Sequence, residues 1–327
     1  MRLATLRNGT PDGQLVVVCA AAARYLPAGP ALPNLLTAIE NWGSAEATLA
    51  ALSSELADGA GLPLDPAQLA APLPRSWQWL DGSAFGTHGD LMQVAFNMPP
   101  IETDLPLMYQ GMSDRFYGPT DPVPFADPAH GIDFEGEFGV IVDAVPMGTS
   151  ARDAAAHIKL VVQINDWSLR TLAPIEMKTG FGWVQAKPAC SMAPFAVPPA
   201  ALGQGWHDNR VALDLVVDWN GAPFGHANGR AMDFSFAELV AHAARTRDLV
   251  AGTVIGSGTV SNPEYASVGS SCISERRAIE IIADGKPATA FMAIGDHVRM
   301  EARGADGSTP FGAIDQQVVQ ASLPAAS

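Results

Sequence analysis

The 327-residue chain is short of cysteine, of basic residues and of long apolar runs, and each shortage excludes a class of protein. Its three cysteines, Cys19, Cys190 and Cys272, are widely spaced and form no CxxC pair, which argues against a zinc ribbon or a disulfide framework. Lys and Arg number 19 against 34 Asp and Glu, so the net charge of −15 disfavours nucleic acid and an anionic membrane as partners. No apolar run reaches about 18 residues and the start shows no signal-peptide pattern, so we expect a cytoplasmic protein.

No G-x-G-x-x-G loop opens a helix, which disfavours a nucleotide cofactor. The acidic charge does not exclude a small anionic substrate, because a few local cations and a metal ion can reverse the field inside a cleft. The chain does contain 48% apolar residues and many scattered turn formers, Gly 31 and Pro 26. This composition indicates a globular protein of many short strands joined by turns.

Residues 1–75 are predicted to form a small N-terminal domain. Two strand-prone runs, 2–7 and 14–19, flank the turn sequence NGTPDG, which predicts a hairpin. Apolar residues then recur at helical spacing over 35–56, which predicts two helices with a break at Gly43-Ser44.

Residues 76–327 are predicted to form the larger domain, with the proline-rich stretch 62–74 as a linker in front of it. Strand-like runs recur in this domain at 134–142, 157–165, 211–221, 252–260, 278–285 and 297–304. Helical patterns are fewer, at 150–157 and 234–249. The predicted fold class is therefore mostly β (α+β), with a few covering helices.

The most informative segment runs from Ile132 to Val142 and carries three acids at alternate positions. If it is a strand, Asp133, Glu135 and Glu137 point to the same face. Carboxylates this close repel one another unless a cation lies between them, and the hard ions Mg²⁺, Mn²⁺ and Ca²⁺ prefer oxygen ligands. The spacing alone also fits an edge strand whose acidic face is simply solvated, which is the commoner case.

A second segment, 161–170, ends an apolar run on Asn165 and Asp166. Asp166 is placed to add a carboxylate, and Arg170 adds a planar cation four residues later. An ordinary turn at a strand end explains the Asn-Asp pair as well. Lys187 follows an aromatic, glycine-rich stretch, although an isolated lysine usually lies on the surface.

Together these segments resemble the fumarylacetoacetate hydrolase family, from about Trp77 to the end of the chain. The motifs that carry the resemblance are Glu135-Gly136-Glu137, Asn165-Asp166-Trp167-Ser168-x-Arg170, Lys187, Gly256-Ser257-Gly258-Thr259-Val260-Ser261 and Gly295-Asp296-His297-Val298. One such motif is weak evidence, but their order along the chain matches the family. The resemblance implies a mixed β-roll/β-sandwich catalytic domain, a small N-terminal α/β domain and a homodimer.

The resemblance also implies a metal site. Glu135, Glu137 and Asp166 would hold a divalent ion, Mg²⁺ or else Mn²⁺ or Ca²⁺. Asp81 would supply a fourth ligand, because family members carry an Asp seven residues before a catalytic histidine, and here that spacing leads to His88.

Five residues receive roles in catalysis or substrate binding from the same resemblance. His88 would be the general base, although a lone histidine can equally be a structural, hydrogen-bonded residue. Arg170 and Lys187 would stabilise negative charge as it develops. Tyr109 and Thr259 would hydrogen-bond the substrate.

At four positions the sequence departs from the family pattern. These are Leu91, Asn97, Ala173 and Ile273, where members carry a Glu, a substrate-binding Arg, a Gln and the acid that orients the histidine. Two nearby acids, Asp90 and Glu275, could replace the orienting acid, and the sequence does not choose between them.

The resemblance implies an enzyme that cleaves a carbon–carbon bond in a small anionic acylpyruvate or β-diketo acid, similar to fumarylacetoacetate or fumarylpyruvate, as in aromatic-compound catabolism. The same metal site would suit an oxaloacetate-type decarboxylase or a keto-acid isomerase or hydratase. Decarboxylation needs no attacking water, so a missing histidine–acid pair would favour it. Two alternatives of other classes are a keto-acid-binding protein without catalysis and a β-rich structural protein with solvated acids.

Overall fold

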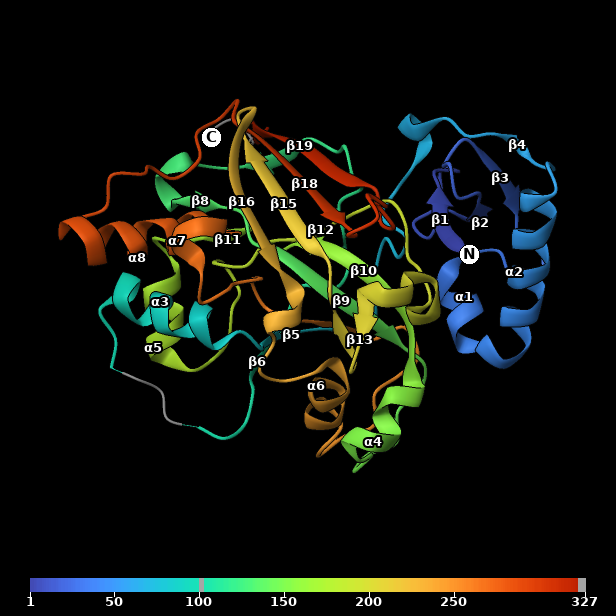
Figure 1. The fold of residues 1–327 in the computed structure, drawn as a ribbon, viewed down its shortest axis with the longest axis horizontal. Helices are drawn as coiled ribbons and strands as arrows, with labels where there is room; N and C mark the ends of the chain where they lie inside the picture. Colours follow the sequence, from blue (N-terminus) through green and yellow to red (C-terminus); the bar gives the residue numbers. More distant parts are fainter. Residues whose placement is uncertain (100–102, 323–327) are drawn as a thin grey trace, which may run out of the picture.

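The computed structural model describes residues 1–99 and 103–322, which form a small N-terminal unit and a larger body (Figure 1). The small unit is a four-stranded antiparallel sheet with two helices beside it. Its elements are β1 (Arg2–Leu6), β2 (Gln14–Val18), β3 (Arg24–Pro27), α1 (Leu35–Glu40), α2 (Trp42–Ala57) and β4 (Leu62–Pro63). The predicted hairpin is confirmed, because β1 and β2 pair in antiparallel register along their whole length.

Two predictions for this unit were wrong. The helix break falls at Asn41, which ends α1 and accepts a hydrogen bond from the Ser44 hydroxyl through its backbone carbonyl. Asparagine suits helix ends, whereas Gly43 is tolerated in the first turn of α2. The stretch 62–74 is not a free linker, because β4, the 3-10 helix η1 (Pro66–Gln68) and backbone hydrogen bonds to β1 fix it in place.

Two sheets form the larger body. The six-stranded sheet has the order β12-β10-β9-β17-β5-β6, in which β17 and β5 are parallel and the other pairs antiparallel. Its strands are β5 (Trp79–Ser83), β6 (Leu107–Gly111), β9 (Gly136–Val142), β10 (Ile158–Asn165), β12 (Ser191–Met192) and β17 (Val254–Gly256). The five-stranded sheet has the order β16-β15-β18-β19-β7. Its strands are β7 (Val123–Phe125), β15 (Asp214–Trp219), β16 (Ala222–Asn228), β18 (His297–Arg303) and β19 (Ala313–Gln320).

Short strand pairs and helices complete the body. The pairs are β8 (Ile132–Asp133) with β11 (Ser168–Leu169), and β13 (Trp206–His207) with β14 (Arg210–Val211). The helices are α3 (Gly86–Phe96), α4 (Ala151–Ala154), α5 (Ala173–Thr179), α6 (Phe236–Ala243), α7 (Tyr265–Val268) and α8 (Ile273–Asp284), and the 3-10 helices are η2 (Pro128–His130), η3 (Ala155–His157), η4 (Pro199–Gly205) and η5 (Gly229–Ala231). Figure 1 shows α3, α5 and α8 grouped at one end of the sheets and α4 and α6 at another. Among the described residues, no helix is long and apolar enough to cross a membrane.

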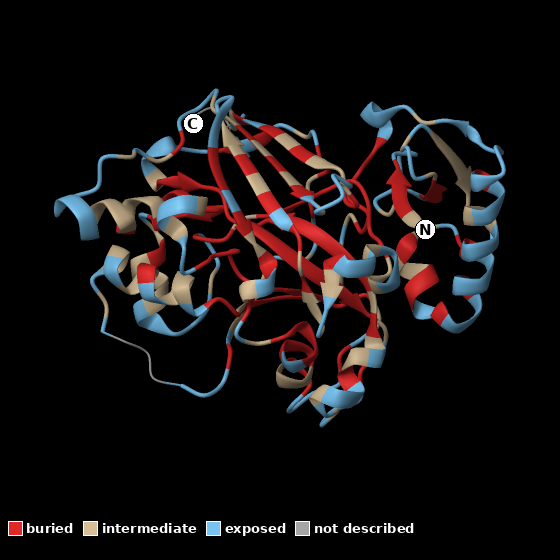
Figure 2. Ribbon diagram, viewed as in Figure 1, coloured by how far each residue is buried: buried red, intermediate tan, exposed pale blue. Residues whose placement is uncertain are grey.

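The inner strands β9, β10 and β17 of the six-stranded sheet are buried on both faces, whereas the edge strand β6 is partly exposed (Figure 2). One face packs on the five-stranded sheet, so closely that a Cβ at Gly136 would stand 2.7 Å from the Leu215 side chain. The other face carries Ile141 and Leu160, which share a core with Leu15 of the N-terminal unit. Burial on both faces explains why β9 and β10 are continuous apolar runs rather than alternating ones. The predicted α+β class, in which sheets form the body and helices cover them, is confirmed.

One predicted strand is a helix. The run 278–285 lies in α8, which begins after Cys272 and ends at Gly285, a residue in the left-handed conformation. The isoleucines of this run favour a strand when taken alone. The buried residues of the full segment, Ile273, Ser274, Glu275 and Ala278, instead follow helical spacing, which becomes visible only when the window starts earlier. Helix α3 was not predicted.

Candidate metal centre and active site

Three buried carboxylates meet at the end of the six-stranded sheet. Asp81 lies in β5, Glu137 in β9 and Asp166 directly after β10, and each offers an oxygen within 4.8 Å of the others. Strand pairing brings them together, because Glu137 lies opposite Ile164 in the β9–β10 register and both β5 and β9 flank β17. Three of the four predicted metal ligands therefore form one cluster.

The glycine-rich turn after β17 holds Asp81 in place. The Gly258 N–H donates to Asp81 Oδ1 over 3.1 Å, in a backbone conformation with a positive φ of 75°. At Gly256, a Cβ would stand 2.4 Å from the same oxygen, so a larger residue would displace the carboxylate. These two positions need glycine for the approach of β5.

The cluster fits a hard divalent cation. The three side chains are at most 5% exposed, and neither oxygen of Glu137 accepts a hydrogen bond from a described residue. Buried carboxylates without donors are unfavourable unless a cation compensates them. Burial and the neighbouring acids raise the pKa values of Asp81 and Glu137 well above the ordinary range, and burial raises the pKa of Asp166. A set of oxygen ligands alone suits Mg²⁺, Mn²⁺ or Ca²⁺.

Glu135, the fourth predicted ligand, lies beside the cluster rather than in it. Arg170 and Lys187 occupy its two oxygens: the guanidinium of Arg170 pairs with Oε1, and Lys187 Nζ lies 2.6 Å from Oε2. Burial would raise the pKa of Glu135, but these two cations outweigh it and hold that pKa below the ordinary value. Lys187 also pairs with Asp166, so its ammonium group links Glu135 to the cluster. A ligand role for Glu135 stays a prediction.

Arg170 is buried and joins two acids. Its Nε lies 2.8 Å from Asp133 Oδ2, and its other arm reaches Glu135. Asp133 also accepts hydrogen bonds from the backbone N–H groups of Ile273 and Ser274, at the first turn of α8. The sequence placed Asp133 on the same acidic face as its neighbours, whereas its carboxylate anchors a helix N-terminus, a favourable place for negative charge.

His88 lies in the first turn of α3 and pairs with a fully buried acid. Its Nδ1 is 2.9 Å from Glu275 Oε1, which projects from α8. Of the two acids that could replace the missing partner, the structure pairs Glu275 with the histidine, whereas Asp90 is exposed. The expected position, Ile273, contributes only its backbone N–H to Asp133, and the acid two residues later reaches His88 instead.

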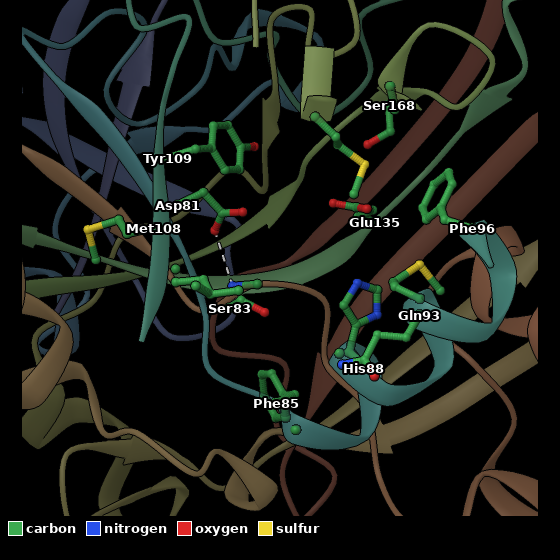
Figure 3. Close-up of a pocket in the computed structure, with 18 of the residues that line it drawn as sticks. Asp81, Ser83, Phe85, His88, Gln93, Phe96, Met108, Tyr109, Glu135 and Ser168 are labelled. Carbon is green, nitrogen blue, oxygen red and sulfur yellow. Dashed lines mark hydrogen bonds between the residues drawn. The ribbon is translucent and has the colours of Figure 1, made fainter. Parts of the chain in front are cut away.

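A cavity of about 550 Å³ lies beside these groups, and Asp81 of the carboxylate cluster lines it, whereas Glu137 and Asp166 lie behind its wall. Figure 3 shows Asp81, Tyr109, Glu135 and His88 around this hollow, and Arg170 and Lys187 also line it. The Tyr109 hydroxyl, from β6, donates to Asp166 Oδ2 over 2.5 Å, and burial followed by the Asp166 charge raises its pKa well above the ordinary value.

Among the five residues predicted to act in catalysis or substrate binding, Thr259 is the one that does not line the cavity. Its neighbour Gly258 lines the cavity, whereas Thr259 is buried and its hydroxyl has no hydrogen-bond partner among the described residues. The sequence missed a different polar neighbour, Cys190, whose thiol donates to Asp166 Oδ1 over 3.0 Å. Burial and Asp166 raise the pKa of Cys190, which keeps it a protonated donor. No sequence signal marks this cysteine.

The remaining departures from the family pattern have local explanations. Asn97 ends α3 with φ 51°, a left-handed conformation that asparagine tolerates better than arginine. Leu91 is buried on α3. Ala173 lines the cavity at the start of α5, where a longer side chain would take up cavity space.

Two family models match the chain. The "Fumarylacetoacetate (FAA) hydrolase C-terminal" model matches residues 78–319, and the "Fumarylacetoacetase N-terminal domain 2" model matches residues 1–75. A protein of Burkholderia lata, provisionally classed as a hydrolase, is 25% identical over 248 residues, which span 72% of this chain and 85% of that protein.

Solved structures share the fold over nearly the full length. Fumarylacetoacetate hydrolase from Exiguobacterium antarcticum has 16% identity and a TM-score of 0.68, covering 98% of this chain and 100% of that one. Maleylpyruvate hydrolase from Sphingobium sp. SYK-6, in complex with manganese(II) and pyruvate, has 19% identity and a TM-score of 0.66 with the same coverage. A 5-carboxymethyl-2-hydroxymuconate delta-isomerase from Mycobacterium smegmatis has 18% identity and a TM-score of 0.61, covering 99% and 100%. Because the C-terminal family model matches most of this chain, residues 78–319, the chain belongs to the fumarylacetoacetate hydrolase family.

Proposed function

We propose that the chain is a metal-dependent hydrolase that cleaves a carbon–carbon bond in a small acylpyruvate or β-diketo acid. The observation that carries the proposal is that a buried carboxylate cluster and a histidine–glutamate pair serve one cavity. Asp81 from the cluster and His88 from the pair both line it. Perturbed acids and an oriented histidine in one cavity are typical of a catalytic site.

Asp81, Glu137 and Asp166 would hold the cation, with Glu135 as a further candidate ligand. When bound there, a divalent cation supplies a Lewis acid for the paired oxygens of a keto acid and for the enolate that cleavage leaves behind. The related maleylpyruvate hydrolase structure contains manganese(II) and pyruvate, which supports this use of the cluster. Mg²⁺ as the native ion stays a prediction.

His88 would act as the general base. Glu275 is hydrogen-bonded to Nδ1, so a proton on Nδ1 leaves Nε2 as the acceptor for a proton from water. The activated water would attack the acyl carbonyl carbon, and the buried carboxylate of Glu275 would stabilise the imidazolium that results.

Arg170 and Lys187 would bind the substrate carboxylate and stabilise charge that develops on the leaving enolate. Burial would lower the pKa values of both side chains, but the adjacent carboxylates raise them above their ordinary values, so both stay cationic. Tyr109, whose hydroxyl bonds the same Asp166 oxygen as Lys187, would orient the substrate through that hydroxyl. Thr259 as a substrate ligand stays a prediction without a contact to the cavity.

The His88–Glu275 pair favours hydrolysis over decarboxylation, because a decarboxylase of oxaloacetate type needs no activated water. An isomerase or hydratase also needs a group that moves protons, so the reaction products distinguish these from a hydrolase. A keto-acid-binding protein without catalysis would need no buried partner for His88.

Products distinguish these functions directly. The protein is incubated with Mg²⁺ or Mn²⁺ and with acetylpyruvate, fumarylpyruvate or oxaloacetate, and the products are separated by chromatography. We expect pyruvate plus the matching carboxylic acid from an acylpyruvate. Pyruvate and CO₂ from oxaloacetate alone would instead indicate a decarboxylase, and tight oxalate binding without any turnover would indicate a binding protein.

Three further expectations belong to this proposal. A homodimer is expected and is tested by size-exclusion chromatography with light scattering. A role in aromatic-compound catabolism would follow if an acylpyruvate is the substrate. A cytoplasmic location is expected and is tested by cell fractionation.

A further inference from the structure

We infer that the acyl group of the substrate is apolar and uncharged, so that the substrate is a monocarboxylate and not a dicarboxylate such as fumarylpyruvate. This inference rests on the proposed hydrolysis of an acylpyruvate and specifies the half of the substrate that lies away from the metal. It follows from the wall of the cavity and from the positions of its charges.

Much of the cavity wall outside the carboxylate cluster is apolar, with Gln93 and Thr103 as uncharged polar residues within it. The apolar residues come from α3, from positions 98 and 105 after it, and from α5 with the loop that follows it. The side chains that matter here are Met92, Phe96, Met98, Leu105, Met177 and Trp183. Figure 3 shows Phe96 at the same side of the cavity as His88, with which it shares α3. Such a wall favours a hydrocarbon group over a hydrated carboxylate.

The basic groups that line the cavity are all paired with buried acids. Among the described residues that line it, the basic ones are His88, Arg170 and Lys187, and each is bonded to at least one buried carboxylate. The pyruvyl carboxylate of the substrate would use Arg170 and Lys187, and His88 is the proposed base. Residues 100–102, outside the described range, are Pro, Ile and Glu and bring no basic side chain to the sequence.

Apart from Asp81 and Glu135, the other charged residues that line the cavity are two acids, Asp233 and Asp90. The N–H of Gly86 donates to Asp233 Oδ2 over 2.7 Å and holds this carboxylate in place. A distal carboxylate on the substrate would therefore meet like charge and apolar side chains. An unpaired anion in such a place is strongly disfavoured, whereas an alkyl or alkenyl group is stabilised by burial.

The test compares matched substrates with the metal-loaded, full-length protein. Fumarylpyruvate is set against 4-methylpent-2-enoylpyruvate, in which an isopropyl group replaces the distal carboxylate at similar size. We expect kcat/KM to favour the isopropyl compound by about tenfold or more. In the series acetyl-, butanoyl- and hexanoylpyruvate, kcat/KM should rise by up to about fourfold for each buried methylene.

A variant moves the preference in the opposite direction. Phe96→Arg places a cation in the apolar wall and should lower or reverse the ratio between the isopropyl compound and fumarylpyruvate. Phe96→Leu is the matched control and should retain the preference, because it keeps the wall apolar. Since Phe96 is only partly buried, both variants are expected to fold.

The outcomes separate this inference from the proposed function. Acetylpyruvate carries neither distal group, so its turnover reports on the proposed function alone. Turnover of acetylpyruvate with fumarylpyruvate cleaved as well as or better than the isopropyl compound overturns the inference and leaves the function standing. No turnover of any acylpyruvate overturns the proposed function and the inference with it.

Discussion

Glu137 is a side chain whose surroundings are unfavourable unless a cation is near. It is fully buried beside Asp81 and Asp166, and neither of its oxygens accepts a hydrogen bond from a described residue. A side chain selected only for stability would not be ionisable at this place, because an apolar residue would pack there at lower cost. Such a residue is better explained by a function than by folding.

The raised pKa values give the first prediction, which concerns pH. Asp81 and Glu137 titrate higher in the folded chain than in the unfolded chain, so the metal-free protein loses stability as the pH rises from the ordinary carboxyl range through the raised values. A divalent cation bound by these carboxylates removes this loss of stability. The cation also binds more tightly at high pH, because fewer carboxyl protons must leave before it can bind. The rise in melting temperature on adding Mn²⁺ should therefore be larger at about pH 8 than at about pH 5. An equal rise at both pH values would contradict this assignment.

The second prediction concerns the histidine–glutamate pair. His88→Ala should lower kcat for an acylpyruvate by about 10²- to 10⁴-fold, the usual effect of losing a general base. Glu275→Gln should also lower kcat, because a neutral amide stabilises the imidazolium less well than a carboxylate. Both variants should retain Mn²⁺ binding by calorimetry, since neither residue belongs to the carboxylate cluster.

Asp90→Asn is the control for this pair. Asp90 is exposed and lies only two residues from His88 in the sequence. The Asp90→Asn variant should keep most of the wild-type activity. If Asp90→Asn is inactive while Glu275→Gln is active, the orienting acid has been assigned to the wrong residue.

At the scale of elements, α8 is fastened to the strands that carry the site. Asp133 in β8 accepts hydrogen bonds from Ile273 and Ser274 and pairs with Arg170. This contact fixes the first turn of α8, and Glu275 in that turn reaches His88 as a result. The position of β8 therefore fixes where Glu275, and through it the proposed base His88, lies in the cavity.

The third prediction tests this anchor. Asp133→Ala leaves a buried guanidinium partly unpaired and two N–H groups without an acceptor, so the free energy of unfolding should fall by about 3–5 kcal/mol in urea denaturation. Asp143→Ala is the control, since Asp143 forms partly exposed pairs with His157 and Lys159. The Asp143→Ala substitution should lower the free energy of unfolding by about 1 kcal/mol or less. Equal effects of the two substitutions would show that Asp133 is no special anchor.

The elements differ in how far the sequence predicts them. The runs of β9 and β10 are identifiable because both faces of their sheet are apolar, and the start of α6 is marked by the capping box of Ser235 and Glu238. Residues 278–285 were taken for a strand because their isoleucines are strand formers in a short window, whereas the helical spacing of the longer segment and its packing on α3 make it part of α8. Tertiary contacts of this kind are not visible in a local window.

For the whole molecule, the N-terminal unit and the larger body share a core. Leu3 in β1 exchanges backbone hydrogen bonds with Ala196, and Leu15 packs in one cluster with Leu160 and Ile141 of the six-stranded sheet. The division of the chain at residue 75 stays a prediction, and the shared core shows that the parts are not loosely joined. Removing the small unit would expose one face of the sheet that carries the site.

The fourth prediction follows from this shared core. Unfolding by urea should be a single cooperative transition, with tryptophan fluorescence and far-UV circular dichroism giving the same midpoint. Leu160→Ala, at the shared core, should shift that single transition by about 2–5 kcal/mol and leave it single. Two separate transitions would indicate that the two parts fold independently.

The site was predictable to the extent that it lies in contiguous motifs. Glu137, Asp166, Arg170 and Lys187 stand in such motifs, and the structure brings all of them to one place. Glu275 was one of two open alternatives, because the choice depends on how α8 packs on α3. The pairing of Glu135 with two cations and the donor role of Cys190 depend on three-dimensional contacts that no spacing in the chain indicates.

The central claim is that three acids far apart in the chain, Asp81, Glu137 and Asp166, hold one divalent ion. Calorimetric titration of the metal-free protein with Mn²⁺ tests it most directly, with Glu137→Gln as the variant and Glu264→Gln, at a remote exposed position, as the control. We predict one ion for each wild-type and control chain, and loss of binding in Glu137→Gln while its melting temperature is unchanged or higher. Undiminished Mn²⁺ binding in Glu137→Gln, or no binding by the wild-type protein, would contradict the claim.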